Sequence, residues 1–214
     1  MIVAEDIRRA LHRKPGDRPN ARTFLGPDAR DAAVVVPLSL SSPGAPVAFV
    51  LVRSAELRDH AGELGFPGGK VERGESLSAA ALREVEEEIG VGAADVDLLG
   101  ELTPVPVVTG RFLLHPFVAA VGSIPQITSS EHAELHEVPL ARWLTDREEI
   151  EITEAPWRGL DLMVPHFRIG PHVMYGASAA IFFELLSLLS PRPLVTKMVD
   201  EKPWGDRYRR EEKP

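Results

Sequence analysis

Four glutamates, Glu84, Glu86, Glu87 and Glu88, crowd into five consecutive positions of this chain. Like charges one helical turn apart repel each other by roughly 0.2–0.5 kcal/mol per pair, so the cluster needs a compensating cause. On a helix Glu84, Glu87 and Glu88 share one face, whereas Glu86 projects about 200° away from Glu84. Three carboxylates on one face form a hard oxygen-ligand set that suits Mg²⁺ or Mn²⁺, whose charge would turn repulsion into attraction. We therefore predict that these three residues are metal ligands; the alternative is a solvated acidic helix face.

The helix that must carry these carboxylates is expected from Ser76 to Ile89. An apolar stripe recurs at every fourth residue, at Leu77, Ala81, Val85 and Ile89. Gly90 follows where a glycine commonly ends a helix. The stripe would hold one side of the helix on a core and turn the carboxylates toward another side.

The segment from Gly69 to Val91 fits the pattern G-x5-E-x7-R-E-U-x-E-E-x-G-U, in which U is a bulky aliphatic residue. Seven fixed residues at this spacing arise by chance in about one chain per million, at roughly one-in-fifteen odds per position. The segment resembles the Nudix box without a substitution. The fixed positions are Gly69, Glu75, Arg83, Glu84, Glu87, Glu88 and Gly90.

This resemblance implies the Nudix fold, an α/β/α sandwich around a mixed β-sheet, and hydrolysis of a nucleoside diphosphate linked to another moiety. A metal on the box glutamates would neutralise phosphate oxygens and lower the pKa of a bound water. Arg83 would pair with Glu75 and orient the ligand helix. Gly68 and Gly69 would let the backbone approach the metal or the phosphates closely.

The catalytic base has several candidates. Within the superfamily it is either a glutamate of the box or a glutamate from a later loop, and histidines can also serve as bases. The box candidates are Glu84 and Glu87, the later glutamates are Glu131 and Glu134, and the histidines are His60 and His115.

The residues before the box point to a substrate. The segment from Leu51 to Gly69 follows L-x-R-S-x3-R-x3-G-x3-F-P-G-G, which is similar to the segment that precedes the box in coenzyme A pyrophosphatases. The similarity extends, more weakly, over roughly residues 32–189. It implies cleavage of coenzyme A or its thioesters to 3′,5′-ADP and 4′-phosphopantetheine or its acyl form. Arg53 and Arg58 would meet phosphates, for which a guanidinium fork is suited, while Phe66 is expected to pack beneath the box.

Other functions stay open at this point. The start of the last helix, Tyr175 to Ala180, lacks the arginine of the coenzyme A pattern, and Pro106 lies where ADP-ribose pyrophosphatases carry a proline. ADP-ribose or another nucleoside diphosphate derivative is therefore the alternative substrate. A binding module without turnover is disfavoured by the intact glutamates, and an RNA-end hydrolase is disfavoured by the net charge.

The amino-acid composition argues against several classes of function. The 214 residues carry 24 Lys and Arg against 32 Asp and Glu, a net charge of −8, which argues against a broad nucleic-acid surface. The absence of cysteine excludes disulfides and thiolate zinc sites and fits a reducing, cytoplasmic setting. No secretory signal is expected, and the apolar stretch around Glu184 is too short and polar for a membrane span. The expected partner is a small-molecule nucleotide. Enzymes of the family that this chain resembles are often dimers, so a homodimer is possible, but nothing in the sequence marks an interface.

Strand and helix patterns predict an α+β fold of one domain with extensions. Strands are expected at residues 31–40, 45–53, 96–108, 111–121 and 160–170, and helices at 2–13 and 176–189, with a helical turn at 139–146. Residues 54–67 are expected to form a loop. We expect an N-terminal extension at 1–30, the Nudix domain at 31–190 and a polar tail at 191–214, which is poorly ordered or docks through Trp204 and Tyr208.

Overall fold

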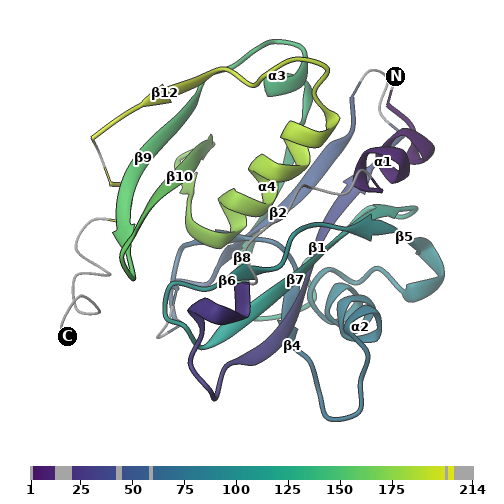
Figure 1. The fold of residues 1–214 in the computed structure, drawn as a ribbon. Coiled ribbons are helices and arrows are strands. Elements are labelled where there is room, and N and C mark those ends of the chain that lie inside the picture. Colours follow the sequence, from purple (N-terminus) through teal and green to yellow (C-terminus); the bar gives the residue numbers. More distant parts are fainter. Residues whose placement is uncertain (1, 13–20, 42–44, 58–59, 201, 205–214) are drawn as a thin grey trace.

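The computed structural model describes residues 2–12, 21–41, 45–57, 60–200 and 202–204. Arg58 and Tyr208 therefore lie outside the described residues. Within these ranges, two sheets and four α-helices make up the fold (Figure 1). The helices are α1 (Ala4–Leu11), α2 (Leu77–Ile89), α3 (Ala141–Leu144) and α4 (Gly176–Leu189), with 3-10 turns at Ala21–Phe24 and Ala93–Asp95.

The larger sheet has eight strands and is mixed, as predicted. Its central strand β1 pairs in parallel with β7 and antiparallel with β2 and β4, while β8 pairs with the opposite edge of β2 and β5 with β7. The strands are β1 (Arg30–Ser39), β2 (Val47–Arg53), β3 (Leu64–Gly65), β4 (Gly68–Lys70), β5 (Val96–Glu101), β6 (Val105–Pro106), β7 (Phe112–Val121) and β8 (His132–Pro139).

Both faces of this sheet are buried, which explains why β1 reads as a nearly continuous apolar run. Successive side chains of a strand point to opposite faces. Ala33 and Val35 join one buried cluster with α2, whereas Val34 and Val36 join a second cluster with α4. The sheet is thus the middle layer of the sandwich that the sequence predicted, with α2 on one face and α1 and α4 on the other (Figure 1).

A second sheet of four strands lies over the α4 side and was predicted only in part. Its strands are β9 (Ile150–Trp157), β10 (Leu160–Ile169), β11 (His172–Met174) and β12 (Thr196–Met198). The sequence predicted β10 but not its long hairpin partner β9. Ile150 and Ile152 of β9 and Phe167 of β10 are buried in the core with α4, so this sheet completes the second hydrophobic layer.

The tail beyond α4 docks in part, as one of the two alternatives proposed. β12 pairs in parallel with β9, and Trp204 packs its ring 5.7 Å from His166 and 5.9 Å from Tyr175. Two other expectations need correction. The segment 54–67 contains the short strand β3, and residues 132–139, to which no strand was assigned, form β8, whose polar residues hide its strand pattern.

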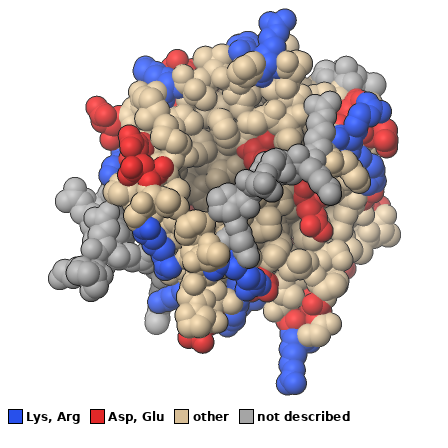
Figure 2. Space-filling view, in the orientation of Figure 1, with Lys and Arg blue, Asp and Glu red and all other residues tan. Residues whose placement is uncertain are grey.

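Within the described residues, no helix is long and apolar enough to cross a membrane. On the face drawn in Figure 2, acidic and basic side chains are interspersed around the rim, and the hollowed middle is mostly uncharged with acidic side chains beside it. An interspersed rim of this kind, on a chain with net charge −8, does not resemble the continuous basic surface that binds nucleic-acid phosphates.

Candidate active site

Helix α2 carries the glutamate cluster, and both of its ends are fixed. The hydroxyl of Ser76 accepts a hydrogen bond from the backbone N–H of Ala79 at 3.1 Å, which satisfies a free donor of the first turn. Gly90 ends the helix with φ of 67°, in the left-handed region that glycine adopts without strain. The Thr128 hydroxyl and N–H donate to the carbonyls of Glu87 and Glu88, so the loop after β7 caps the end that carries the carboxylates.

Arg83 connects the helix to the loop that precedes it. Its Nε and Nη2 donate to the two carboxylate oxygens of Glu75 at 3.0 and 3.2 Å, and Nη2 also donates to the carbonyl of Lys70. The Arg83 hydrogen bond, and then the backbone N–H of Glu72, hold the pKa of Glu75 below its usual range. A two-point guanidinium–carboxylate contact fixes direction as well as distance. Arg83 therefore ties the start of the box to the turn of α2 that carries Glu84 and Glu87.

Glu84 and Glu87 both face the same guanidinium. Nη1 of Arg83 lies 2.7 Å from Glu84 Oε1 and 3.1 Å from Glu87 Oε2. Burial raises the pKa of Glu84, Arg83 opposes this rise, and the negative charges of Glu88 and Glu87 add to it. Glu87 is the most exposed of the three, with 58% of its side chain accessible.

Two glycines let the strand approach these carboxylates. A methyl group on Gly69 would lie 2.1 Å from Oε1 of Glu84, so any larger residue displaces that carboxylate. A methyl group on Gly68 would lie 2.5 Å from the carbonyl oxygen of Ala33 on β1, which would push β4 off its neighbour. The two glycines therefore let the backbone approach Glu84 and β1, while an approach to a metal or to phosphates stays a prediction.

Glu88 is buried, and its carboxylate is held from two sides. The N–H of Gly68 donates to Oε2 at 3.1 Å, and Nε2 of His132 lies 3.0 Å from Oε1. His132 is itself buried. It was not among the site residues predicted from the sequence, and the only signal available was its position directly after the candidate base Glu131.

A bulge in β8 brings His132 to this side of the sheet. The register of β8 against β2 shifts between Val52 and Arg53. Val52 pairs with Glu134 and Arg53 with His132, so β8 contains one extra residue between the two pairs. Regular alternation would put His132 and Glu134 on the same face. Instead His132 reaches Glu88 on α2, while Glu134 reaches His172 on β11, on the other side of the sheet.

The three box glutamates fit a divalent cation by charge and by chemistry. Arg83 donates to both Glu84 and Glu87, the N–H of Gly68 donates to Glu88, and Nε2 of His132 lies beside Glu88. Burial is the main cause of the raised pKa of Glu84, and the negative charges of Glu88 and Glu87 add to it. A set of three carboxylate oxygens favours hard cations such as Mg²⁺ or Mn²⁺ over softer ions.

Arg53 and Glu131, predicted separately, lie together. Nη2 of Arg53 is 3.2 Å from Oε2 of Glu131, and the N–H of Ser54 donates to the carbonyl of Glu131 at 2.7 Å. The Nε of Arg53 is buried and has no hydrogen-bond partner among the described residues. Such a donor is costly unless another group satisfies it. Arg58, the second predicted arginine, lies outside the described residues.

The remaining candidate bases are engaged elsewhere. Nδ1 of His60 lies 2.8 Å from Glu63, and Glu134 lies among histidines on the α4 side of the sheet. His115 contacts Asp31 at 2.8 Å. None of these contacts involves a box glutamate.

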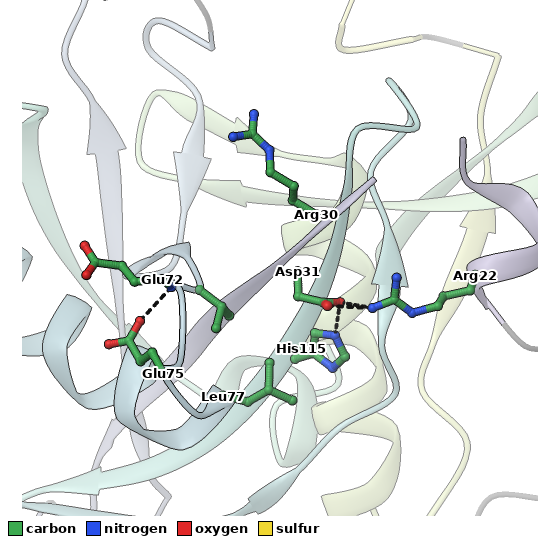
Figure 3. Close-up of a pocket in the computed structure, with 8 residues that line it drawn as sticks. Arg22, Arg30, Asp31, Glu72, Glu75, Leu77 and His115 are labelled. Carbon is green, nitrogen blue, oxygen red and sulfur yellow. Dashed lines mark hydrogen bonds and ion pairs between the residues drawn. The ribbon is translucent and has the colours of Figure 1, made fainter. Parts of the chain in front are cut away.

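His115 lies in a cleft next to the loop that begins the box (Figure 3). Glu75, the partner of Arg83, lines the same cleft, and Asp31 joins His115 to Arg22. Burial raises the pKa of Asp31, but the hydrogen bonds from His115 and Arg22 outweigh burial and bring it below the usual value. His115 is therefore held within an ion-pair network beside the box rather than over its carboxylates.

The mixed sheet between two helical layers, with the glutamate helix against a glycine strand, defines a class of hydrolase. A family model described as the NUDIX domain matches residues 29–158, and the chain belongs to this family. It is a Nudix hydrolase. Enzymes of this family act on small nucleotide substrates with the help of divalent cations, in keeping with the carboxylate set on α2.

Similar proteins agree with this assignment. An uncharacterized Nudix hydrolase named NudL from Photorhabdus laumondii is 33% identical over 164 residues, covering 75% of this chain and 86% of its own. A NudL protein of Pectobacterium atrosepticum is 34% identical over 169 residues, covering 77% and 85%. A solved MutT/nudix family protein from Enterococcus faecalis superposes with a TM-score of 0.50 over 85% of this chain and 72% of its own. At 16% sequence identity that structure shows the fold alone.

Proposed function

We propose that this Nudix hydrolase cleaves the diphosphate of coenzyme A or an acyl-coenzyme A. The products would be 3′,5′-ADP and 4′-phosphopantetheine or its acyl form. One observation carries the proposal: the separate stretches that resemble coenzyme A pyrophosphatases meet in space. Arg53 contacts Glu131, the hydroxyl of Tyr175 donates to Glu63 at 2.8 Å, and Phe66 packs 6.0 Å from Phe182.

These contacts bring together three parts of the chain: the segment before the box, the start of β8 and the first half of α4. The loop that follows β2 is closed by backbone hydrogen bonds from Gly62 to Arg53 and from Arg53 to Glu63. Gly62 has φ of 70°, so the glycine of the upstream pattern fills a left-handed position. Phe66 is buried against α4, which leaves the arginines as the residues of this pattern with suitable chemistry for a substrate.

In the proposed reaction the box glutamates bind the metal ion and the arginines bind the phosphates of the substrate. Glu84, Glu87 and Glu88 would bind Mg²⁺ or Mn²⁺, and the bound cation would supply charge neutralisation and a more acidic water. Arg83 would keep the ligand-bearing turn in register with the glycine strand. Phosphoryl transfer depends mainly on such positioning and charge stabilisation.

Arg53 is the residue that we assign to a substrate phosphate. Its Nε lacks a partner within the described part of the chain, and a phosphate oxygen would satisfy that buried donor. Glu131, on the other side of the same guanidinium, would then either orient Arg53 or act as the catalytic base. A base glutamate from the box, Glu84 or Glu87, is the competing assignment.

A chromatographic product assay tests the substrate. The protein would be given coenzyme A, ADP-ribose, NADH and a diadenosine polyphosphate in parallel, with Mg²⁺ and then Mn²⁺, and with Glu87→Gln as the inactive control. Metal-dependent 3′,5′-ADP from coenzyme A supports the proposal. AMP from ADP-ribose, with coenzyme A not cleaved, would support hydrolysis by the box but would show that ADP-ribose is the substrate. Self-association into a homodimer stays a prediction, which sedimentation equilibrium would check.

A further inference from the structure

A second group of metal-ligand side chains lies away from the box. Glu134 and His136 project from β8, and His172 begins β11 of the smaller sheet. Nε2 of His136 lies 2.9 Å from Oε2 of Glu134, and Nε2 of His172 lies 3.3 Å from the same oxygen. Within the described residues this is the one group of three such side chains whose ligand atoms all lie within 4.8 Å of one another.

These separations match a shared ion. Ligand atoms about 2.1 Å from one metal are separated by roughly 3.0 Å at a right angle and by roughly 3.4 Å at a tetrahedral angle. The two measured separations, 2.9 and 3.3 Å, lie close to that range. The two imidazoles meet edge to face, with centroids 5.4 Å apart, so their Nε2 atoms converge without stacking.

The surroundings leave the group reachable from solvent. The histidine side chains are mostly buried, with 24% and 22% accessible, which restricts their orientation. Glu134 is 51% accessible, so one side of the group is open to an entering ion and to the waters that would complete its coordination.

We propose that Glu134, His136 and His172 bind one divalent transition-metal ion of the Zn²⁺ type, at a site separate from the box. Two imidazole nitrogens and one carboxylate are a common zinc ligand set with a position left for water. Mg²⁺ prefers oxygen ligands, so the box and this site would select different ions.

The site would join two sheets at a strand that also contributes to the candidate active site. β8 carries Glu134 and His136 and begins with His132, which contacts Glu88. β11 leads directly into Tyr175, whose hydroxyl reaches Glu63. An ion shared by β8 and β11 would brace these two segments against each other and stabilise the folded chain.

Calorimetric titration with ZnCl₂ tests the site in the full chain. The parent protein would be Glu84→Gln/Glu87→Gln, which removes two box ligands so that the box does not compete. We expect one equivalent of Zn²⁺ to bind in the presence of excess Mg²⁺. His136→Asn and His172→Asn should each weaken binding at least tenfold. His12→Asn, which removes an exposed histidine directly after α1, should leave it unchanged.

Nitrogen NMR of the histidine rings in the same parent protein provides a readout that requires no histidine substitution. Zn²⁺ should shift the Nε2 signals of His136 and His172 and leave those of His12 in place. Absence of zinc binding in the parent, unchanged affinity in folded histidine variants, or unshifted Nε2 signals would each overturn the proposal. If a histidine variant does not fold, the ring signals of the parent decide.

Discussion

The guanidinium of Arg83 and the carboxylate of Glu75 form a two-point ion pair, with Nε–Oε1 of 3.0 Å and Nη2–Oε2 of 3.2 Å. This pair sets the direction of Nη1, which then reaches Glu84 and Glu87. Because lysine offers only a point charge, it cannot reproduce this fork. The contact therefore acts as a positioning device for the carboxylates of α2.

Arg83→Lys should lower kcat by about 10- to 100-fold, the usual effect of removing a residue that orients metal ligands. Glu75→Gln should have a similar effect, and the double variant should cost little more than either single one, since the two residues act as a unit. Steady-state kinetics with saturating metal would measure all three. Additive losses would show that Arg83 acts independently of Glu75.

Glu87→Gln should reduce hydrolysis by roughly 100-fold or more, because it would remove a proposed metal ligand rather than an orienting partner. Glu87 is exposed, so the melting temperature should change little. Glu86→Gln is the matched control: it removes the same charge one residue away, from an exposed position on another face. Equal activity losses in both variants would point to a general effect of charge and not to a ligand role.

Glu84→Gln should stabilise the protein in EDTA while abolishing its stabilisation by Mg²⁺. The pKa of Glu84 is raised above 4.5 by burial and by its acidic neighbours. Its ionised form therefore costs stability above the raised pKa, and this cost disappears as the pH falls through that pKa toward 4.5. The difference in melting temperature between variant and parent should be positive at pH 7.5 and shrink toward pH 4.5, as calorimetry would show.

The same pKa shift predicts how catalysis depends on pH. Protons compete with the metal for Glu84, so activity at subsaturating Mg²⁺ should fall on acidification earlier than an ordinary glutamate would require. Added Mg²⁺ should move this acid limb to lower pH. An acid limb that is unaffected by the metal concentration would assign the titration to another group.

Gly69→Ala should lose activity by roughly 100-fold with the fold intact, since displacing a catalytic group by about 1 Å costs that much. The added methyl group would meet Glu84 Oε1 at 2.1 Å, and the carboxylate is the part free to move. Gly92→Ala is the control, because Gly92 has φ of −63° and an added methyl group there would meet no atom within 4 Å. Circular dichroism would confirm that both variants fold.

Arg53→Ala should discriminate between phosphates of the substrate. If Arg53 meets the 3′-phosphate, kcat/KM for coenzyme A should fall about 10- to 100-fold, in line with hydrogen bonds to charged groups, while dephospho-coenzyme A is little affected. An equal loss for both substrates would instead place Arg53 at the diphosphate. Arg9→Ala, which removes an exposed arginine from α1, should change neither value.

Local patterns predicted the parts of the fold whose periodicity is unambiguous. The four-residue stripe and the glycine at its end located α2 to within one residue, and the apolar run 176–189 matches α4. β8 escaped prediction because its polar residues interrupt the alternation that marks a strand, and β9 because its alternation is short, from Ile150 to Thr153. β8 pairs with β2, which is distant in sequence, and β9 pairs with the neighbouring β10.

The sequence by itself determined the chemistry of the box, because the spacing of Glu84, Glu87 and Glu88 along one helix fixes their common face. The resemblance to the Nudix box predicted that Arg83 pairs with Glu75, and the two residues are in contact. Only the tertiary structure decided that His132 contacts Glu88 and that Glu134 turns away to two histidines. The reason is physical: a one-residue bulge in β8 reverses which face a side chain points to, and such a bulge depends on the register with β2.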